Sequence, residues 1–197
     1  MNEFPHIVLA SASPRRRELL DQLGVAHDVL PVDVDESERP GELPSVLARR
    51  LALAKALEGR SRSGGRSTVL GSDTVVAIGN EVFGKPRDRA DAIRMLVALG
   101  GREHQVLTAV AVAPADGGEP LEALSVTTVR MRPIGADEAG AYWDSGEPAG
   151  KAGGYAIQGR GARFIEHIAG SYSGVMGLPL YETVRLLQAL GPAGEGR

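Results

Sequence analysis

The sequence predicts an α/β domain with a mixed central sheet and flanking helices. Strand-like apolar runs alternate with segments in which apolar residues recur at helical spacing, and this alternation is typical of α/β proteins. The 197 residues, 43% of them hydrophobic, can bury one sizeable core. No internal repeat or linker divides the sequence. We therefore expect one domain over residues 1–190 and a disordered tail over residues 191–197.

The first third of the chain predicts strands and helices in alternation. Ser13 suits the position before a first helix, Pro14 suits its first turn, and Gly24 suits its end. In the next helix, apolar residues recur every three or four positions, and Gly59 follows as the expected end. Residues 60–66, rich in Ser, Gly and Arg, predict a mobile linker. The expected elements are strands at 7–10 and 27–32 and helices at 14–23 and 44–57.

The centre of the chain is rich in strand signals, and its C-terminal part mixes short elements. Gly79-Asn80 suits a hairpin turn. Asp88 can cap the helix that follows it, and Tyr142 and Trp143 suit the core. The expected strands are 68–70, 74–78, 82–83, 105–113, 121–132, 155–158 and 162–168, and the expected helices are 88–99, 137–143 and one that Pro179 starts.

Composition excludes several classes of protein. The 22 Lys and Arg against 25 Asp and Glu give a net charge of −3, so no overall positive field draws the chain to nucleic acid or anionic lipid. Cysteine is absent, which excludes disulfides and Cys-ligated metal. No signal-type segment or apolar run of membrane-spanning length occurs. We expect a cytoplasmic protein with no nucleic-acid or membrane partner, in which any affinity for phosphate is local.

The most informative segment is the predicted strand–turn–helix junction near the N-terminus. Ser13 and Pro14 start a helix whose first N–H groups and positive dipole end are free. The guanidinium groups of Arg15 and Arg16 add two fixed positive charges at the same point. Together these groups suit a phosphate. The alternative is a solvated basic helix start.

An acidic residue interrupts a second apolar run. Asp73 lies between Leu70 and Val75, and aspartate is unfavourable in strands. One interpretation is a turn or bulge. The other is a carboxylate that holds a metal ion or takes a proton from water.

Two lysines and a glutamine complete the candidates. Lys85 stands between Gly84 and Pro86, which would hold it in place as a point charge for phosphate. Lys55 lies late in a predicted amphipathic helix, and Gln158, in a glycine-rich segment, can read a base edge. For each of these three residues the alternative is an ordinary solvated side chain.

Other common sites find no support. Residues 146–152 look like a phosphate-binding loop but are one residue short and carry Ala152 where a hydroxyl is needed. No Gly-x-Gly-x-x-Gly follows a strand, and the four histidines lack metal-ligand spacing. A dinucleotide fold and a histidine-based metal site are therefore excluded.

Five segments taken together resemble the signature motifs of the Maf family of nucleoside triphosphate pyrophosphatases, also called septum formation inhibitor proteins. They occur in the family's order and span most of the chain, so the combination is specific although each motif alone is weak. They are LASASPRR (9–16), GSDTVV (71–76), GKP (84–86), KAGGYAIQG (151–159) and GSYSGVMGLPL (170–180).

The resemblance implies an elongated, two-lobed domain with a deep cleft, assembled as a homodimer. It implies hydrolysis of dTTP or UTP to the monophosphate and pyrophosphate, with a divalent cation (Mg²⁺ or Mn²⁺) as cofactor. Asp73 matches the family's proton acceptor, and Arg15, Thr74 and Gln158 match positions that separate the dTTP/UTP branch from the branch acting on methylated GTP. The positions that match the phosphate and metal pocket are Ser13, Arg16, Glu36, Lys55 and Lys85.

The chemistry of these residues is consistent with that activity. Arg15, Arg16, Lys55 and Lys85 can neutralise a triphosphate and its leaving group, and two carboxylates suffice for Mg²⁺ when phosphate oxygens and water complete its shell. Whether Asp73 is base, metal ligand or both stays open, as do two other functions: a pyrophosphatase for methylated GTP and a non-catalytic nucleotide-binding regulator of cell division. The expected roles are catalysis by Asp73 and Lys85, substrate binding by Ser13, Arg15, Arg16, Lys55, Thr74 and Gln158, and metal binding by Glu36 and Asp73.

Overall fold

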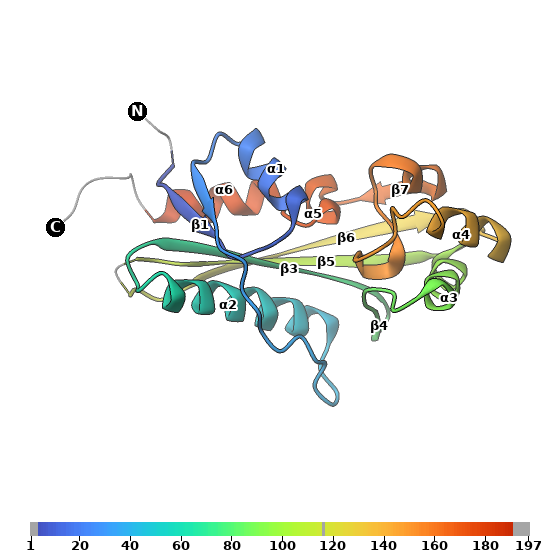
Figure 1. Cartoon of the computed structure of the whole chain (residues 1–197), viewed down its shortest axis with the longest axis horizontal. Coiled ribbons are helices and arrows are strands. Elements are labelled where there is room, and N and C mark those ends of the chain that lie inside the picture. Colours follow the sequence, from blue (N-terminus) through green and yellow to red (C-terminus); the bar gives the residue numbers. More distant parts are fainter. Residues whose placement is uncertain (1–3, 116, 191–197) are drawn as a thin grey trace.

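A seven-stranded mixed sheet with helices on both faces forms the molecule (Figure 1). The computed structural model describes residues 4–115 and 117–190, so the tail expected over residues 191–197 lies outside the described residues. The strands are β1 (Ile7–Leu9), β2 (His27–Val29), β3 (Thr68–Ile78), β4 (Glu81–Phe83), β5 (Glu103–Ala113), β6 (Leu121–Met131) and β7 (Ile165–Ala169). The helices are α1 (Pro14–Gln22), α2 (Pro44–Arg62), α3 (Arg89–Leu99), α4 (Ala136–Trp143), α5 (Tyr172–Met176) and α6 (Leu180–Ala189), with 3₁₀ turns η1 (Ala152–Gly154) and η2 (Gly159–Phe164). The predicted fold class is confirmed.

The order of the strands leaves a gap in the sheet beside β3. The sheet runs β2-β1-β3-β5-β6-β7, with β1 parallel to β2 and β3 and the remaining pairs antiparallel. On the side of β3 away from β5, β1 pairs with Thr68–Leu70 and β4 pairs with Val76–Ile78. No described strand pairs with residues 71–75 on that side. Among the described residues, the middle of β3 therefore has a free edge on that side.

Two hydrophobic clusters lie on one face of the sheet, one on each side of this gap. The first contains Leu70 and Val110 and packs against α1 and α6, and the second contains Val76 and Val106 and packs against α3 and α4. Because side chains alternate between the faces of a strand, the residues between the clusters share their face. These residues are polar: they are Ser72 and Thr74 on β3 and Thr108 on β5. A polar band thus separates two cores, as a two-lobed domain requires.

Helix α2 covers the opposite face and is longer than the sequence predicts. It packs on β3 and β5 (Figure 1) and continues through Gly59 to Arg62, so the predicted end at Leu57 and the linker from residue 60 are wrong. A Cβ at Gly59 would lie 2.7 Å from Val69 and one at Gly71 2.3 Å from the Ala52 carbonyl. Both glycines therefore allow close packing and do not end an element.

Strand β3 is continuous over eleven residues, so the predicted break between residues 70 and 74 is wrong. The interpretation of Asp73 as part of a turn or bulge is wrong as well, because Asp73 pairs in register with Ala109 of β5. The long ladder with β5 and the packing of α2 outweigh the poor strand propensities of glycine and aspartate.

Five smaller differences remain, four of them in the C-terminal third. No strand forms over residues 155–158, and residues 159–164 form η2. Of the strand predicted at 162–168, only residues 165–168 lie in β7, which pairs with β6. Helix α5 was not predicted, and Pro179 precedes α6 as its N-cap. The strand predicted at 27–32 ends at Val29. The caps at Asp88 and the burial of Tyr142 are confirmed, while Trp143 is half-buried.

Within the described residues, no helix combines the length and apolar character needed to cross a membrane.

A buried histidine gives the fold a pH-dependent stability. His104 is 2% exposed, and its Nε2 lies 2.8 Å from the Tyr155 hydroxyl. Burial lowers the pKa of His104 to about 4. Below pH ~6.5 His104 is protonated in the unfolded chain but stays neutral in the folded chain. The contribution of His104 to the free energy of unfolding therefore falls as the pH drops from ~6.5 to ~4. The total loss is about 3 kcal/mol.

Chemical denaturation at a series of pH values tests this expectation. His104→Gln keeps a polar group that can reach the Tyr155 hydroxyl but cannot titrate in this range. The free energy of unfolding of the wild-type chain should therefore fall more steeply than that of the variant between pH 6.5 and 4. Parallel curves for the two proteins would contradict the assignment.

Candidate active site

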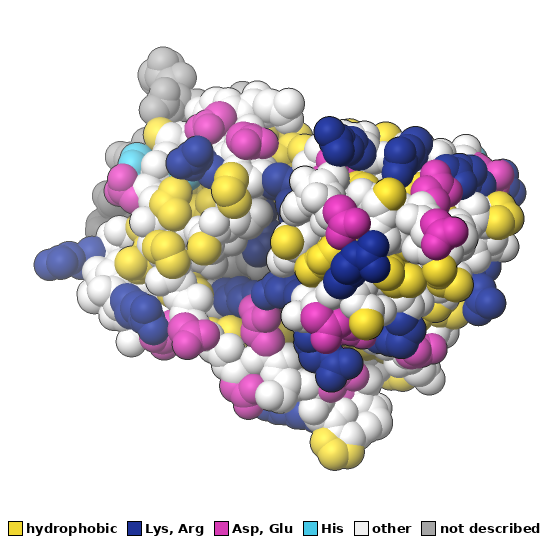
Figure 2. All heavy atoms as spheres, turned by 45° about the vertical axis from the view of Figure 1, so that its right-hand side comes forward, with side chains coloured by type: hydrophobic (Ala, Val, Ile, Leu, Met, Phe, Trp, Pro, Cys, Tyr) yellow, Lys and Arg dark blue, Asp and Glu magenta, His cyan; other side chains and the backbone are white. Residues whose placement is uncertain are grey.

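A cavity of about 650 Å³ lies at the gap beside β3. Its walls include the segment that leaves β1, the start of α1, the middle of β3 and the segment after β4. Glu36, Lys55 of α2, residues 149–152 and the end of α5 with Gly177 line it as well. Figure 2 shows this side of the molecule hollowed, with dark-blue Lys and Arg side chains gathered at the hollow. The cavity therefore joins parts of the chain that are far apart in sequence.

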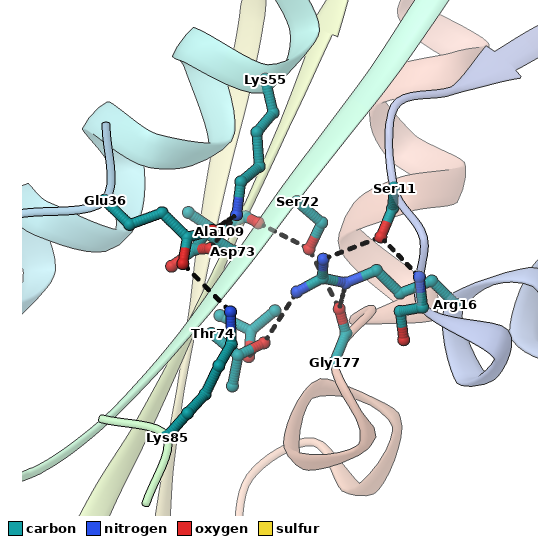
Figure 3. Close-up of polar contacts among 12 residues, drawn as sticks. Ser11, Arg16, Glu36, Lys55, Ser72, Asp73, Thr74, Lys85, Ala109 and Gly177 are labelled. Carbon is teal, nitrogen blue, oxygen red and sulfur yellow. Dashed lines mark hydrogen bonds and ion pairs between the residues drawn. The ribbon is translucent and has the colours of Figure 1, made fainter. Parts of the chain in front are cut away.

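One end of the cavity holds two carboxylates joined by lysines. Lys55 Nζ lies 2.6 Å from an oxygen of Glu36 and 2.6 Å from an oxygen of Asp73. Lys85 Nζ lies 3.0 Å from the other oxygen of Glu36. In Figure 3, Lys55 extends from α2 to the point where the two carboxylates meet, and Lys85 approaches from the opposite side. The four side chains form one charged network.

Alternation along β3 explains how this network forms. Asp73 shares its strand face with Val75 and Ala77, which pack against α2. Its carboxylate therefore points toward α2, where the buried Lys55 meets it. Both residues are only 8% exposed, so their ion pair is screened little by solvent.

Glu36 is ionised over nearly the whole pH range. Its partial burial favours the neutral carboxyl, but hydrogen bonds and charges from Lys55 and Lys85 outweigh burial and lower the pKa of Glu36 to about 2. Glu36 thus keeps its negative charge at any pH at which the protein is expected to work.

The other end of the cavity holds arginines that bind backbone and hydroxyl oxygens. Arg16 Nε donates to the Gly177 carbonyl at 2.8 Å, and its terminal nitrogens lie 3.1 Å from Ser11 Oγ and 3.4 Å from Thr74 Oγ1 (Figure 3). Arg15 Nε donates to the Met176 carbonyl at 3.1 Å. Burial lowers the pKa of both arginines. The two side chains fasten the start of α1 to the segment after α5.

Most of the predicted site residues come together in this cavity. Gln158 is the exception among them, because it precedes η2 and is not part of the cavity lining. Ser13 occupies the N-cap of α1 as predicted, but its side chain makes no capping hydrogen bond. The predicted residues that line the cavity are Ser13, Arg15, Arg16, Glu36, Lys55, Asp73, Thr74 and Lys85.

Sequence reasoning missed several residues that shape the site. Ser11 accepts from Arg16, and Ser72 Oγ lies 2.9 Å from the Ala109 carbonyl and 3.0 Å from that of Gly177. Lys151 lines the cavity too. Ser11 and Lys151 belong to the motifs already singled out, but the partners of Ser72 lie 37 and 105 residues away, so no local signal could reveal them.

The donor set limits what a metal ion could use. Within the described residues, no three His, Cys, Asp or Glu side chains gather closely enough to hold a metal by themselves. Glu36 and Asp73 share a cation, Lys55, at 2.6 Å each. Mg²⁺ needs only one or two carboxylates when phosphate oxygens and water supply the rest of its shell. The pair therefore fits a divalent cation that a phosphate ligand helps to hold.

Comparison with known proteins gives consistent results over nearly the whole chain. Residues 6–190 match the family model Maf, described as Maf-like protein. A protein of Xanthomonas campestris pv. campestris named dTTP/UTP pyrophosphatase is 53% identical over 188 residues, which cover 94% of this chain and 98% of that protein. A protein of the same name from Bordetella parapertussis is 51% identical over 197 residues, covering 96% and 94%.

A third relative named dTTP/UTP pyrophosphatase, from Pseudoalteromonas translucida, is 52% identical over 182 residues, covering 92% of this chain and 95% of that protein. Among solved structures, a nucleoside-triphosphatase / dITP/XTP pyrophosphatase from Mycobacterium abscessus gives a TM-score of 0.47 at 17% identity, covering 95% of this chain and 98% of that one.

Proposed function

This chain belongs to the Maf family, and we propose that it hydrolyses dTTP and UTP to the nucleoside monophosphate and pyrophosphate. The observation that carries the proposal is the convergence of two carboxylates and four cations on one cavity: Asp73, Glu36, Arg15, Arg16, Lys55 and Lys85. Relatives that share about half of its residues bear the name of this activity. The chemistry below follows from the contacts of those side chains.

Hydrolysis at the α-phosphorus needs a positioned water, a proton acceptor and compensation of charge on the leaving pyrophosphate. Asp73 is the proposed proton acceptor, since its carboxylate stands in the cavity wall at 2.6 Å from Lys55. The hydrogen bond from Lys55 Nζ holds that carboxylate in place. Lys85, whose side chain is 60% exposed, is free enough to turn from Glu36 toward a phosphate. Ser13 and the first residues of α1 line the same cavity, and the start of a helix favours an anion.

We propose Mg²⁺ or Mn²⁺ as the cofactor, with Glu36 and Asp73 as its protein ligands. Bound there, a divalent cation would lower the pKa of a water molecule and offset phosphate charge. Because Lys55 and Lys85 together already offset the charge of both carboxylates, the protein alone should bind the cation weakly. Nucleotide phosphates would supply the missing ligands, so we expect cation and nucleotide to bind together.

Release of pyrophosphate from a panel of nucleotides tests the function. Purified protein should release pyrophosphate from UTP and dTTP in the presence of Mg²⁺ or Mn²⁺ and should stop when a chelator is added. GTP, methylated GTP and CTP serve as competing substrates. No release from any nucleotide would favour the non-catalytic regulator, and a preference for methylated GTP would favour the other branch of the family.

The role of Gln158 can be tested by the same panel. If its amide reads the base, Gln158→Ala should change the ratio of kcat/KM between UTP and CTP or GTP by roughly tenfold, which is the loss expected for one or two hydrogen bonds. The rate on the best substrate should change less. Gln188→Ala, an exposed position on α6, is the matched control. Unchanged ratios would show that Gln158 does not read the base.

The homodimer, the cytoplasmic location and the lack of a nucleic-acid partner stay predictions. Light scattering of the purified protein measures the first. A net charge of −3 gives no general attraction to nucleic acid, and a mobility-shift assay with DNA and RNA checks this expectation.

A further inference from the structure

Positive charge is distributed unevenly in the cavity. At one end, Lys55 and Lys85 are paired with Glu36 and Asp73, so the charges there balance. At the other end stand Arg15, Arg16 and Lys151. Within residues 4–115 and 117–190, none of these three side chains forms an ion pair with a carboxylate. The excess positive charge of the cavity therefore lies at the arginine end.

Lys151 is the member of this group that no part of the proposed mechanism uses. It follows Gly150, whose φ of 70° turns the chain, and its Nζ donates to the Glu147 carbonyl. Burial and the neighbouring charge of Arg15 both lower the pKa of Lys151. Two like charges in a cavity, each bonded only to neutral carbonyls, gain stability when an anion enters between them.

The backbone around Lys151 is held by other groups. The Glu147 carboxylate accepts from the Tyr142 hydroxyl at 2.6 Å and from the backbone N–H groups of Arg160 and Gly161 at 2.9 Å each. Gly153 N–H donates to the Gly84 carbonyl at 3.0 Å. These contacts hold the segment in addition to the bond from Lys151 Nζ to the Glu147 carbonyl, and none of them depends on the charge of Lys151.

We propose that Lys151, with Arg15, binds the pyrophosphate part of the nucleotide, both as the two terminal phosphates of the substrate and as the product. This inference rests on the proposed function. The two terminal phosphates carry most of the charge of a nucleoside triphosphate, and they need cations that no carboxylate already neutralises. Cleavage takes place at the other end, where Asp73 and Glu36 stand. Lys151 is thus a substrate-binding residue beyond those assigned above.

Calorimetric titration with inorganic pyrophosphate and, separately, with UMP tests the proposal. Lys151→Gln removes the charge, Lys151→Arg keeps it, and Arg160→Gln removes a charge from an exposed position of the same segment. We expect Lys151→Gln to weaken pyrophosphate binding by roughly tenfold to a hundredfold, the loss of one charge-assisted hydrogen bond. UMP binding should change less than about twofold, and the other two variants should stay close to wild type.

Several results would overturn the proposal. Wild-type protein that binds no pyrophosphate, or equal affinity in wild type and Lys151→Gln, would remove Lys151 from this role. So would an equal loss of UMP and pyrophosphate binding, or the same loss in Arg160→Gln, which would indicate only the general field of the segment. Near-wild-type affinity in Lys151→Arg excludes a folding defect as the cause.

The titration also separates this inference from the proposed function. Pyrophosphate binding that depends on Lys151, in a protein that hydrolyses no nucleotide, would support the subsite and refute the pyrophosphatase. Hydrolysis of UTP with no effect of Lys151→Gln on the KM or on product binding would support the pyrophosphatase activity and refute the role of Lys151.

Discussion

Asp73→Asn is expected to reduce pyrophosphate release by at least roughly a hundredfold, the contribution typical of a general base. Asparagine has nearly the same shape and can still accept the hydrogen bond from Lys55 that aspartate accepts at 2.6 Å. It cannot accept a proton from water. Binding of a non-hydrolysable UTP analogue should persist, because removing a negative charge does not weaken attraction for an anion.

The measurement pairs steady-state kinetics with calorimetry on the same protein. Asp144→Asn, an exposed residue that pairs with Arg89, is a matched control and should keep normal turnover. Near-normal turnover in Asp73→Asn would exclude Asp73 from the mechanism. Loss of both turnover and binding would instead place Asp73 in substrate or metal binding.

Lys55→Met is expected to destabilise the protein by about 3–5 kcal/mol, the usual cost of removing one partner from a buried ion pair. Lys55 is 8% exposed, and its ammonium group pairs with both Asp73 and Glu36. Without it, two carboxylates meet with no cation between them, and repulsion raises the pKa of at least one of them. The free energy of unfolding from chemical denaturation measures the loss.

Two further measurements separate this electrostatic effect from a packing defect. The double variant Lys55→Met with Asp73→Asn should recover part of the lost stability, since one of the repelling charges is gone. Mn²⁺ added without nucleotide should raise the melting temperature of Lys55→Met more than that of the wild type, because the carboxylates become available to the ion. A Lys55→Met protein as stable as wild type would show that the network does not carry the expected energy.

The sequence predicted which residues gather in the cavity better than it predicted the elements that hold them. Asp73 could be identified because its charge stands out in an apolar run, but the continuity of β3 depends on a ladder with β5 and on α2 packing over Gly71. Gly59 looked like a helix end, although it serves close contact with Val69. These contacts join residues distant in sequence, and a local pattern contains no information about them.

The contacts of Arg15 and Arg16 could likewise be predicted only in part from the sequence. A phosphate site at the start of the first helix could be predicted from Ser13, Arg15 and Arg16. That the Nε atoms of Arg15 and Arg16 bind carbonyls 161 residues away could not be predicted, since these partners belong to a segment with no charge to mark it. Arg16 consequently joins two segments that are distant in sequence, besides lining the cavity.

The gap between β1 and β4 has a consequence for how recognition can evolve. The Leu70 carbonyl accepts from the Ala10 N–H, so the strand repeat directs the peptide groups of Ser72 and Thr74 the same way, into the crevice. Peptide groups directed this way can offer donors and acceptors to a ligand in the crevice. Substitution changes side chains but leaves the peptide groups in place. Ligand selectivity that depends on these peptide groups should therefore persist when the side chains change. The same recess also shields a strand edge that would otherwise invite aggregation.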